Sequence, residues 1–217
     1  MDPVELISLT GYVMPVGNGS VGKSSVARIL DRLSSESVTY ADLISSVSKT
    51  KNLEFEFIPT GLCFQGIPYK ILIQMLVPPG QRGNHLDGTG RSFEDVIQIY
   101  RFYIRRIDVV LLTYSLADRE SFYATEQWLA KVAELCNFRT CFILLGTHLD
   151  QMDRREVGQD QITDGLEFLT RHITLVIPAW QGKFTHLEIS NLTGYHLNEL
   201  KKYLAWCIFL SRCPIIP

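Results

Sequence analysis

The segment GNGSVGKSS, residues 17–25, separates an apolar run at residues 5–16 from a helix-like run at residues 22–34. It matches the pattern G-x-x-x-x-G-K-[ST] in the context that this pattern requires, directly after an expected strand and at the start of an expected helix. Glycines let the backbone wrap so that successive N–H groups point at an anion, and the helix N-terminus adds partial positive charge. The segment therefore predicts a loop that binds a nucleoside phosphate. The alternative is a glycine- and serine-rich turn with Lys23 in solvent.

Residue types within this loop indicate separate roles for its side chains. Lys23 would reach the β- and γ-phosphates, and the hydroxyl of Ser24 would be a ligand of Mg²⁺. The other predicted contacts to the nucleotide in this loop are Gly19, Ser20, Val21, Gly22 and Ser25. The loop does not identify the base, which must be recognised elsewhere on the sheet.

Strand and helix patterns alternate along the chain. The expected strands are 5–16, 53–65, 67–77, 108–115, 141–147 and 184–190, and the expected helices are 22–34, 92–106, 118–136, 160–172 and 197–210. Such alternation predicts an α/β fold, with a mostly parallel sheet of about six strands covered by helices on both faces. Ligands of such sheets bind at the carboxyl ends of the strands.

Length and composition restrict the class of protein. We expect residues 1–217 to form one domain, with a glycine-rich loop around residues 80–91. The net charge of −2 argues against a nucleic-acid partner. Five scattered cysteines without a C-x-x-C pair suggest reduced thiols and a cytoplasmic location. No segment is apolar over a length that would span a membrane, and the apolar last helix either packs on the domain or offers peripheral contact to a membrane or partner.

The strand at 141–147 runs into THLD, residues 147–150. The carboxylate of Asp150 can accept hydrogen bonds from N1–H and from the exocyclic amine of guanine, whereas adenine offers neither donor in that geometry. The next strand leads into a second polar segment, formed by Ser190, Asn191 and Leu192. Each of these motifs is weak by itself.

In this order and spacing, the motifs resemble those of the Ras superfamily of small GTPases across nearly the whole chain. GNGSVGKSS is similar to the P-loop of that family, THLD to its Asn/Thr-Lys-x-Asp motif, and EISNLTG to its E-x-S-A-K segment. TYSLADRESFYATEQWL, residues 113–129, is similar to a strand and helix of Rab-type members. The resemblance implies a switch that binds GTP or GDP with Mg²⁺ and hydrolyses GTP slowly. Its partners would be effectors, GTPase-activating proteins and exchange proteins.

The resemblance also implies roles at the base. Asp150 would recognise guanine, Thr147 would brace the loops, and the backbone N–H of Asn191 would bond the guanine O6. His148 stands where the family has a lysine, and its ring could stack on the base or lie in solvent.

The switch regions depart from the family pattern. TKNLEFEF, residues 50–57, is similar to a Rab-type segment and makes Thr50 the candidate second ligand of Mg²⁺. In VPPGQ, residues 77–81, Gly80 would donate its N–H to the γ-phosphate and Gln81 would orient the attacking water. Val77 replaces the usual aspartate, which implies a weaker hold on Mg²⁺.

The Pro-Gly-Gln sequence of this second switch also resembles that of bacterial gliding-motility GTPases of the MglA type. The replacements at Val77 and His148 leave an alternative open, a pseudo-GTPase that binds nucleotide as a scaffold with little hydrolysis. A P-loop kinase or ATPase is disfavoured, because THLD and EISNLTG predict a guanine site.

Overall fold

The computed structural model describes residues 6–32, 53–79, 92–100, 104 and 106–213. Six strands form one sheet in the order β2-β3-β1-β4-β5-β6. The strands are β1 (Ile7–Val16), β2 (Glu54–Phe64), β3 (Ile67–Val77), β4 (Val109–Ser115), β5 (Cys141–Thr147) and β6 (Phe184–Glu188). All neighbouring pairs are parallel except β2 and β3. The predicted α/β class and mostly parallel sheet are confirmed; the assignment of residues 1–217 to one domain stays a prediction.

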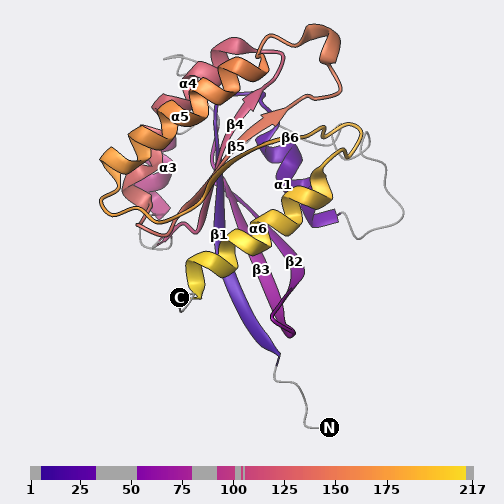
Figure 1. Cartoon of the computed structure of the whole chain (residues 1–217), viewed down its shortest axis with the longest axis vertical. Coiled ribbons are helices and arrows are strands. Elements are labelled where there is room, and N and C mark those ends of the chain that lie inside the picture. The colour runs from indigo at the N-terminus through magenta and orange to yellow at the C-terminus, as the bar shows by residue number, and fades with distance from the viewer. Residues whose placement is uncertain (1–5, 33–52, 80–91, 101–103, 105, 214–217) are drawn as a thin grey trace.

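Helices cover both faces of the sheet (Figure 1). One face carries α1 (Lys23–Arg32) and α6 (Leu197–Arg212), and the other carries α3 (Phe93–Tyr100), α4 (Arg119–Val132) and α5 (Gln159–Val176). Two short 3₁₀ turns, η1 (Ala133–Leu135) and η2 (Met152–Arg154), follow α4 and β5. Within the described ranges, no helix combines the length and apolar character needed to cross a bilayer.

The alternation of side chains along each strand produces two separate cores. Val13 faces the core beneath α1 and α6, while the next residue, Met14, faces the core beneath α3, α4 and α5. In β5, Ile143 and Phe142 divide in the same way. Because both faces are buried, the central strands are continuously apolar in sequence.

A two-residue turn explains the antiparallel edge of the sheet. Phe64 pairs with Ile67, and the turn residues Gln65 and Gly66 have φ angles of 50° and 79°. Two positive φ angles are typical of a type I′ hairpin turn, in which glycine is favoured. The hairpin expected around Gly66 is therefore present.

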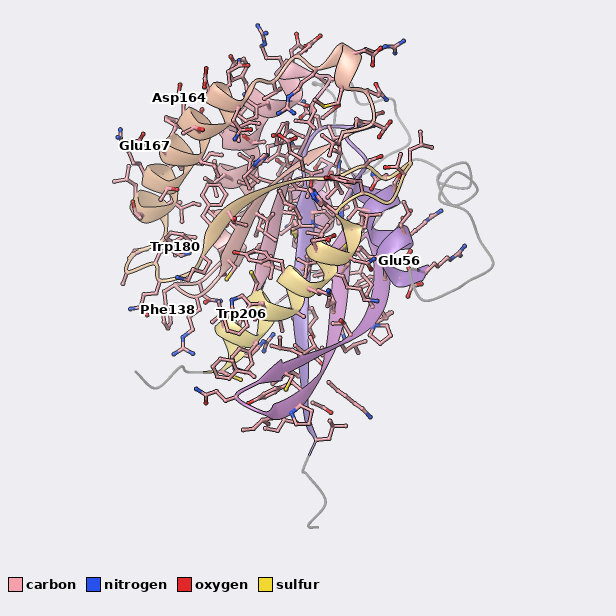
Figure 2. The ribbon with its side chains drawn as sticks, turned by 45° about the vertical axis from the view of Figure 1, so that its right-hand side comes forward. Glu56, Phe138, Asp164, Glu167, Trp180 and Trp206 are labelled. Carbon is pink, nitrogen blue, oxygen red and sulfur yellow. The ribbon has the colours of Figure 1, made fainter. Side chains whose placement is uncertain are left out.

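The last helix packs against the sheet and the hairpin. A Cβ atom on Gly11 of β1 would lie 2.5 Å from Ile208, so the absent side chain lets α6 approach β1 closely. The ring of Trp206, labelled in Figure 2, lies 5.7 Å from that of Phe64, and the ring of Phe209 lies 4.8 Å from the same ring. The last helix thus packs on the domain, as one of the two alternatives expected, and contact of its outer face with a membrane or partner stays a prediction.

Candidate nucleotide-binding site

The parallel strands place the carboxyl ends of β1, β3, β4, β5 and β6 along one edge of the sheet, and the phosphate loop, residues 17–24, lies there. The backbone of the loop approaches its neighbours very closely. A Cβ atom on Gly17 would lie 2.1 Å from the carbonyl oxygen of Thr113, and one on Gly22 would lie 2.7 Å from Nδ2 of Asn191. Both glycines also have positive φ angles, 149° and 89°. Side chains at these two positions would therefore displace the loop.

Lys23 is the first residue of α1, and its side chain folds back into the phosphate loop. Its Nζ donates hydrogen bonds of 2.8 Å to the carbonyl of Gly17 and 2.6 Å to that of Asn18. The side chain is buried, and burial lowers the pKa of Lys23 from 10.5 to about 7. A bound phosphate would favour the protonated amine at this position.

The other predicted loop residues lie around the start of α1. Val21 is buried, Ser20 is exposed with a φ of 65°, and Ser24 and Ser25 are half-buried in the first turn of the helix. Among the described residues, no cluster of three or more His, Cys, Asp or Glu side chains is suited to a metal ion.

Thr147, the last residue of β5, connects the base end of the site to the phosphate loop. Its buried hydroxyl lies 2.8 Å from the carbonyl oxygen of Val21 and 2.9 Å from that of Tyr114. Nδ1 of His148 lies 3.0 Å from the same hydroxyl. The hydroxyl has a single proton, and the two carbonyls can only accept it. When the proton points to either carbonyl, Nδ1 of His148 must therefore carry a hydrogen and donate it to the hydroxyl oxygen.

His148 adopts a left-handed backbone conformation, with a φ of 62°. Burial lowers the pKa of its ring, while the charge of Asp150 raises it. Because the pKa is lowered from 6.5, the ring is neutral at neutral pH. Stacking on a base would therefore occur without a positive charge, unlike at a lysine.

The carboxylate of Asp150 is oriented by the segment that follows β6. The hydroxyl of Ser190 donates a 2.5 Å hydrogen bond to Oδ1 of Asp150 and accepts one of 3.1 Å from the N–H of Thr193. The two loops are also joined by a 3.1 Å bond from the N–H of Leu149 to the carbonyl of Ile189. Asp150 is thus an exposed but oriented acceptor.

The side chain of Asn191 contacts the phosphate loop, which the sequence did not suggest. Its Nδ2 lies 3.4 Å from the carbonyl oxygen of Gly22, and the residue is only 8% exposed. Among the described residues, Oδ1 has no hydrogen-bond partner. The family pattern has alanine here, so only the backbone of Asn191 was assigned a role. The neighbouring Leu192 is half exposed.

A second unpredicted contact joins the phosphate loop to α4. Nε1 of Trp128 donates a 2.9 Å hydrogen bond to Oδ1 of Asn18. Asn18 occupies one of the unspecified positions of the loop pattern, and Trp128 belongs to an ordinary amphipathic helix. Neither residue was therefore distinguished in the sequence.

Three predicted residues lie outside the described part of the chain: Thr50, Gly80 and Gln81. Val77, the last residue of β3, is described and is 1% exposed within the apolar core that includes Val26. At the position where the family has its switch aspartate, the side chain of this chain is therefore packed in the apolar core.

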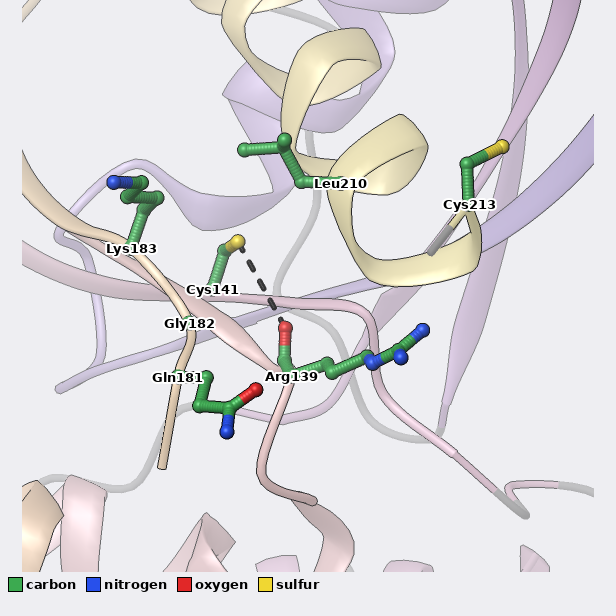
Figure 3. Close-up of a pocket in the computed structure, with 7 residues that line it drawn as sticks. All are labelled: Arg139, Cys141, Gln181, Gly182, Lys183, Leu210 and Cys213. Atoms are coloured by element: carbon green, nitrogen blue, oxygen red, sulfur yellow. Dashed lines mark hydrogen bonds between the residues drawn. The ribbon is translucent and has the colours of Figure 1, made fainter. Parts of the chain in front are cut away.

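A cavity of about 200 Å³ lies elsewhere, at the amino end of β5 (Figure 3). Arg139, Lys183, Cys141 and Cys213 contribute to its wall. Sγ of Cys141 lies 3.9 Å from the carbonyl oxygen of Arg139. Because Cys141 and Thr147 are the opposite ends of β5, this cavity is separate from the candidate nucleotide site.

Comparison with known proteins adds independent information. Residues 86–176 match the model of the Ras family, a segment that begins after the phosphate loop. The chain is 38% identical over 117 residues to the human EF-hand calcium-binding domain-containing protein 4B, covering 52% of this chain and 16% of that protein. It is 30% identical over 63 residues to human Ras-related protein Rab-30, covering 29% of this chain and 31% of Rab-30. The matches thus cover less than a third of either relative.

Proposed function

We propose that the chain is a GTP-binding switch, because its motifs resemble those of the Ras-superfamily small GTPases, its sheet has the corresponding α/β class, and residues 86–176 match the Ras family model. It binds GTP or GDP, hydrolyses GTP slowly, and changes its protein partners with the nucleotide state. The main support is Asp150, whose carboxylate is oriented by Ser190 at the same sheet edge as the buried amine of Lys23.

Different described residues would contact the phosphates and the base of the nucleotide. Lys23 neutralises phosphate charge, and Asp150 accepts two hydrogen bonds from guanine. Thr147 holds the carbonyl of Val21 and Asn191 contacts that of Gly22, so consecutive loop residues are tied to the base end. This arrangement keeps the phosphate and base contacts at a fixed separation, which reduces the ordering cost of binding.

Mg²⁺, when bound with the nucleotide, would be held by Ser24 and Thr50 and would neutralise charge on the β- and γ-phosphates. Gln81 orients the attacking water and Gly80 donates its N–H to the γ-phosphate. Intrinsic hydrolysis is slow in this class because an added arginine usually supplies further charge stabilisation. The buried, apolar Val77 supports the second candidate function, a pseudo-GTPase with weak metal binding and little hydrolysis.

Effectors, GTPase-activating proteins and exchange proteins complete the proposal, together with a cytoplasmic location. The five cysteines are free thiols, which supports a reducing compartment. A net charge of −2 supports partners other than nucleic acids. Peripheral membrane contact through α6 has less support, because much of its apolar surface is buried against the sheet and hairpin.

The proposal is tested by measuring which base the protein prefers and whether a substitution at Asp150 changes that preference. Asp150→Asn replaces one acceptor oxygen with a donor, so it should weaken GDP binding by about 2–4 kcal/mol, since a donor then faces the guanine donors. Xanthine has a carbonyl where guanine has its amine, so the variant should instead bind xanthosine diphosphate. Competition against a fluorescent nucleotide measures both, and nucleotide released from purified protein identifies the natural ligand.

A Glu167→Gln variant is the control, because that carboxylate is exposed on α5 and pairs with Arg171. ATP displacing GDP as well as GTP does would contradict guanine selectivity. Loss of GDP binding in Asp150→Asn without a gain for xanthosine diphosphate would contradict direct contact between Asp150 and the base.

A further inference from the structure

We propose that Trp128 is a positioning residue that couples the start of α3 to the phosphate loop through Asn18. The consequence for nucleotide affinity rests on the proposed function, whereas the coupling itself is a property of the protein alone. It links the nucleotide site to the helix that follows residues 80–91 in the chain, the segment with the predicted switch residues.

The first half of the coupling is a hydrogen bond to the loop. Nε1 of Trp128 donates to Oδ1 of Asn18 at 2.9 Å, and Trp128 is 4% exposed. The backbone carbonyl of the same asparagine accepts the 2.6 Å bond from Nζ of Lys23. The indole therefore restrains the side chain of Asn18, and the backbone carbonyl of Asn18 is one of the two acceptors of the Lys23 amine that would contact phosphate.

The second half is a set of contacts between Trp128 and the first turn of α3. The ring of Phe93 lies 5.4 Å from that of Trp128 at 85°, an edge-to-face pair of two buried side chains. Nζ of Lys131 lies 5.1 Å from the centre of the indole ring and 2.8 Å from Oε1 of Glu94. The indole thus contacts α3 directly and, through Lys131, a second time.

Two reciprocal hydrogen bonds hold the first turn of α3 together, so that any movement there would displace the whole turn. The N–H of Ser92 donates to Oδ2 of Asp95, and the N–H of Asp95 donates to Oγ of Ser92, both at 3.0 Å. This reciprocal cap fixes the first turn, which includes Phe93. Movement of that turn would shift the indole, break its bond to Asn18 and loosen the loop. By linkage, a loop held by nucleotide would stabilise the same position of α3.

The chain offers a matched control for the loss of an indole hydrogen bond. Nε1 of Trp180 donates to the carbonyl of Thr140 at 2.8 Å, next to the amino end of β5 (Figure 2). Trp180→Phe removes the same kind of bond as Trp128→Phe, but at the opposite end of the sheet. A general loss of stability would therefore affect the loop in both variants, whereas a loss of loop positioning would appear only in Trp128→Phe.

The experiment is amide hydrogen exchange of residues 17–25 in the nucleotide-free full chain. Trp128→Phe and Asn18→Ala should each speed exchange of the loop by roughly fivefold, the value of one hydrogen bond, and the double variant should be no faster. Phe93→Leu should also speed exchange, and should have no further effect when Asn18 is alanine. Asn18→Ser is the milder second variant, and Trp180→Phe should leave the loop unchanged.

The same variants are then tested for release of a fluorescent GDP, where Trp128→Phe and Asn18→Ala should again be faster and non-additive. Equal loop exchange in Trp128→Phe and Trp180→Phe would overturn the proposal, and so would a double variant whose effect is the product of the single effects. Altered, non-additive exchange in a protein that binds no guanine nucleotide would support the coupling and overturn the proposed function instead.

Discussion

Lys23 combines burial with a group that is usually charged, and this combination has a consequence for pH. Its pKa falls from 10.5 to about 7 in the folded protein, so the amine is largely neutral between those values and protonated below them. A nucleotide phosphate beside Nζ favours the charged form and raises the pKa again. Nucleotide binding at this site would therefore be coupled to proton uptake above neutral pH, and the affinity should fall as the pH rises.

We expect nucleotide binding to take up about one proton near pH 8.5 and none below about pH 6. Calorimetry of GDP binding in two buffers with different ionisation enthalpies measures this number directly. Lys70→Met removes an exposed amine on β3, away from the candidate site, and serves as the control, with unchanged uptake. Identical binding heats in both buffers near pH 8.5 would show that Lys23 is already charged in the free protein.

At the level of single residues, the sequence could suggest roles only for groups that belong to a local pattern. Lys23, Ser24 and Asp150 belong to short motifs, and the structure places all three at one sheet edge. The bonds of Asn18 and Asn191 could not be predicted in this way. Asn18 and Trp128 are 110 residues apart, and only tertiary packing brings their side chains together.

At the level of elements, a buried ion pair fixes the end of α6. Asp108 is fully buried and accepts hydrogen bonds from the N–H of Tyr12 at 2.8 Å and from Nη2 of Arg212 at 2.6 Å. The hydroxyl of Ser211 bonds its other oxygen, and Nε of Arg106 lies 3.6 Å from that oxygen. The last turn of α6 is therefore tied to β1 and to the residue before β4.

Removing this carboxylate leaves the partly buried guanidinium of Arg212 and the backbone N–H of Tyr12 without their acceptor. We expect Asp108→Ala to lower the free energy of unfolding by about 3–5 kcal/mol, measured by urea denaturation. Glu167→Ala breaks an exposed ion pair on α5 and should change it by less than about 1 kcal/mol (Figure 2). Similar losses in the two variants would mean that Asp108 contributes no more than a surface charge.

Helix ends show where sequence patterns fail for elements. The expected helix at 160–172 continues to Val176 as α5, although Leu175 is 82% exposed and Val176 is 40% exposed. Buried residues nevertheless recur every four positions through this end of the helix, at Leu169, Ile173 and Ile177, and the exposed apolar residues beside them obscure that pattern in the sequence. Backbone bonding confirms the continuation, because the N–H of Ile177 donates a 2.9 Å bond to the carbonyl of Ile173.

At the level of the whole molecule, the candidate site joins the two halves of the sheet. The phosphate loop follows β1, Thr147 is the last residue of β5, and Ser190 lies just after the end of β6. The alternation of strands and helices predicted this class of fold. The order of the strands could not be obtained from local patterns, because it depends on how each connection crosses the sheet.

Whether the molecule is a working switch or a scaffold depends on Val77 and Gln81 together. Losing the usual aspartate removes one support of Mg²⁺, but this ion keeps several waters, and Ser24 and Thr50 could hold it with two phosphate oxygens. We therefore expect weak hydrolysis with a raised Mg²⁺ requirement. Gln81→Leu should lower the rate by roughly tenfold or more, because an unoriented water loses its attack geometry.

Phosphate release against Mg²⁺ concentration tests this expectation in the wild type and three variants. Val77→Asp should reduce the Mg²⁺ requirement through its charge, and Val77→Asn is the control of similar size without that charge. Since Val77 is 1% exposed among apolar side chains, both Val77 variants should lose stability. Bound nucleotide stabilises the folded state, so the rates of phosphate release are compared in the nucleotide-bound proteins. If the wild type and Gln81→Leu release phosphate equally fast at saturating Mg²⁺, Gln81 does not act in hydrolysis and the pseudo-GTPase becomes the better description.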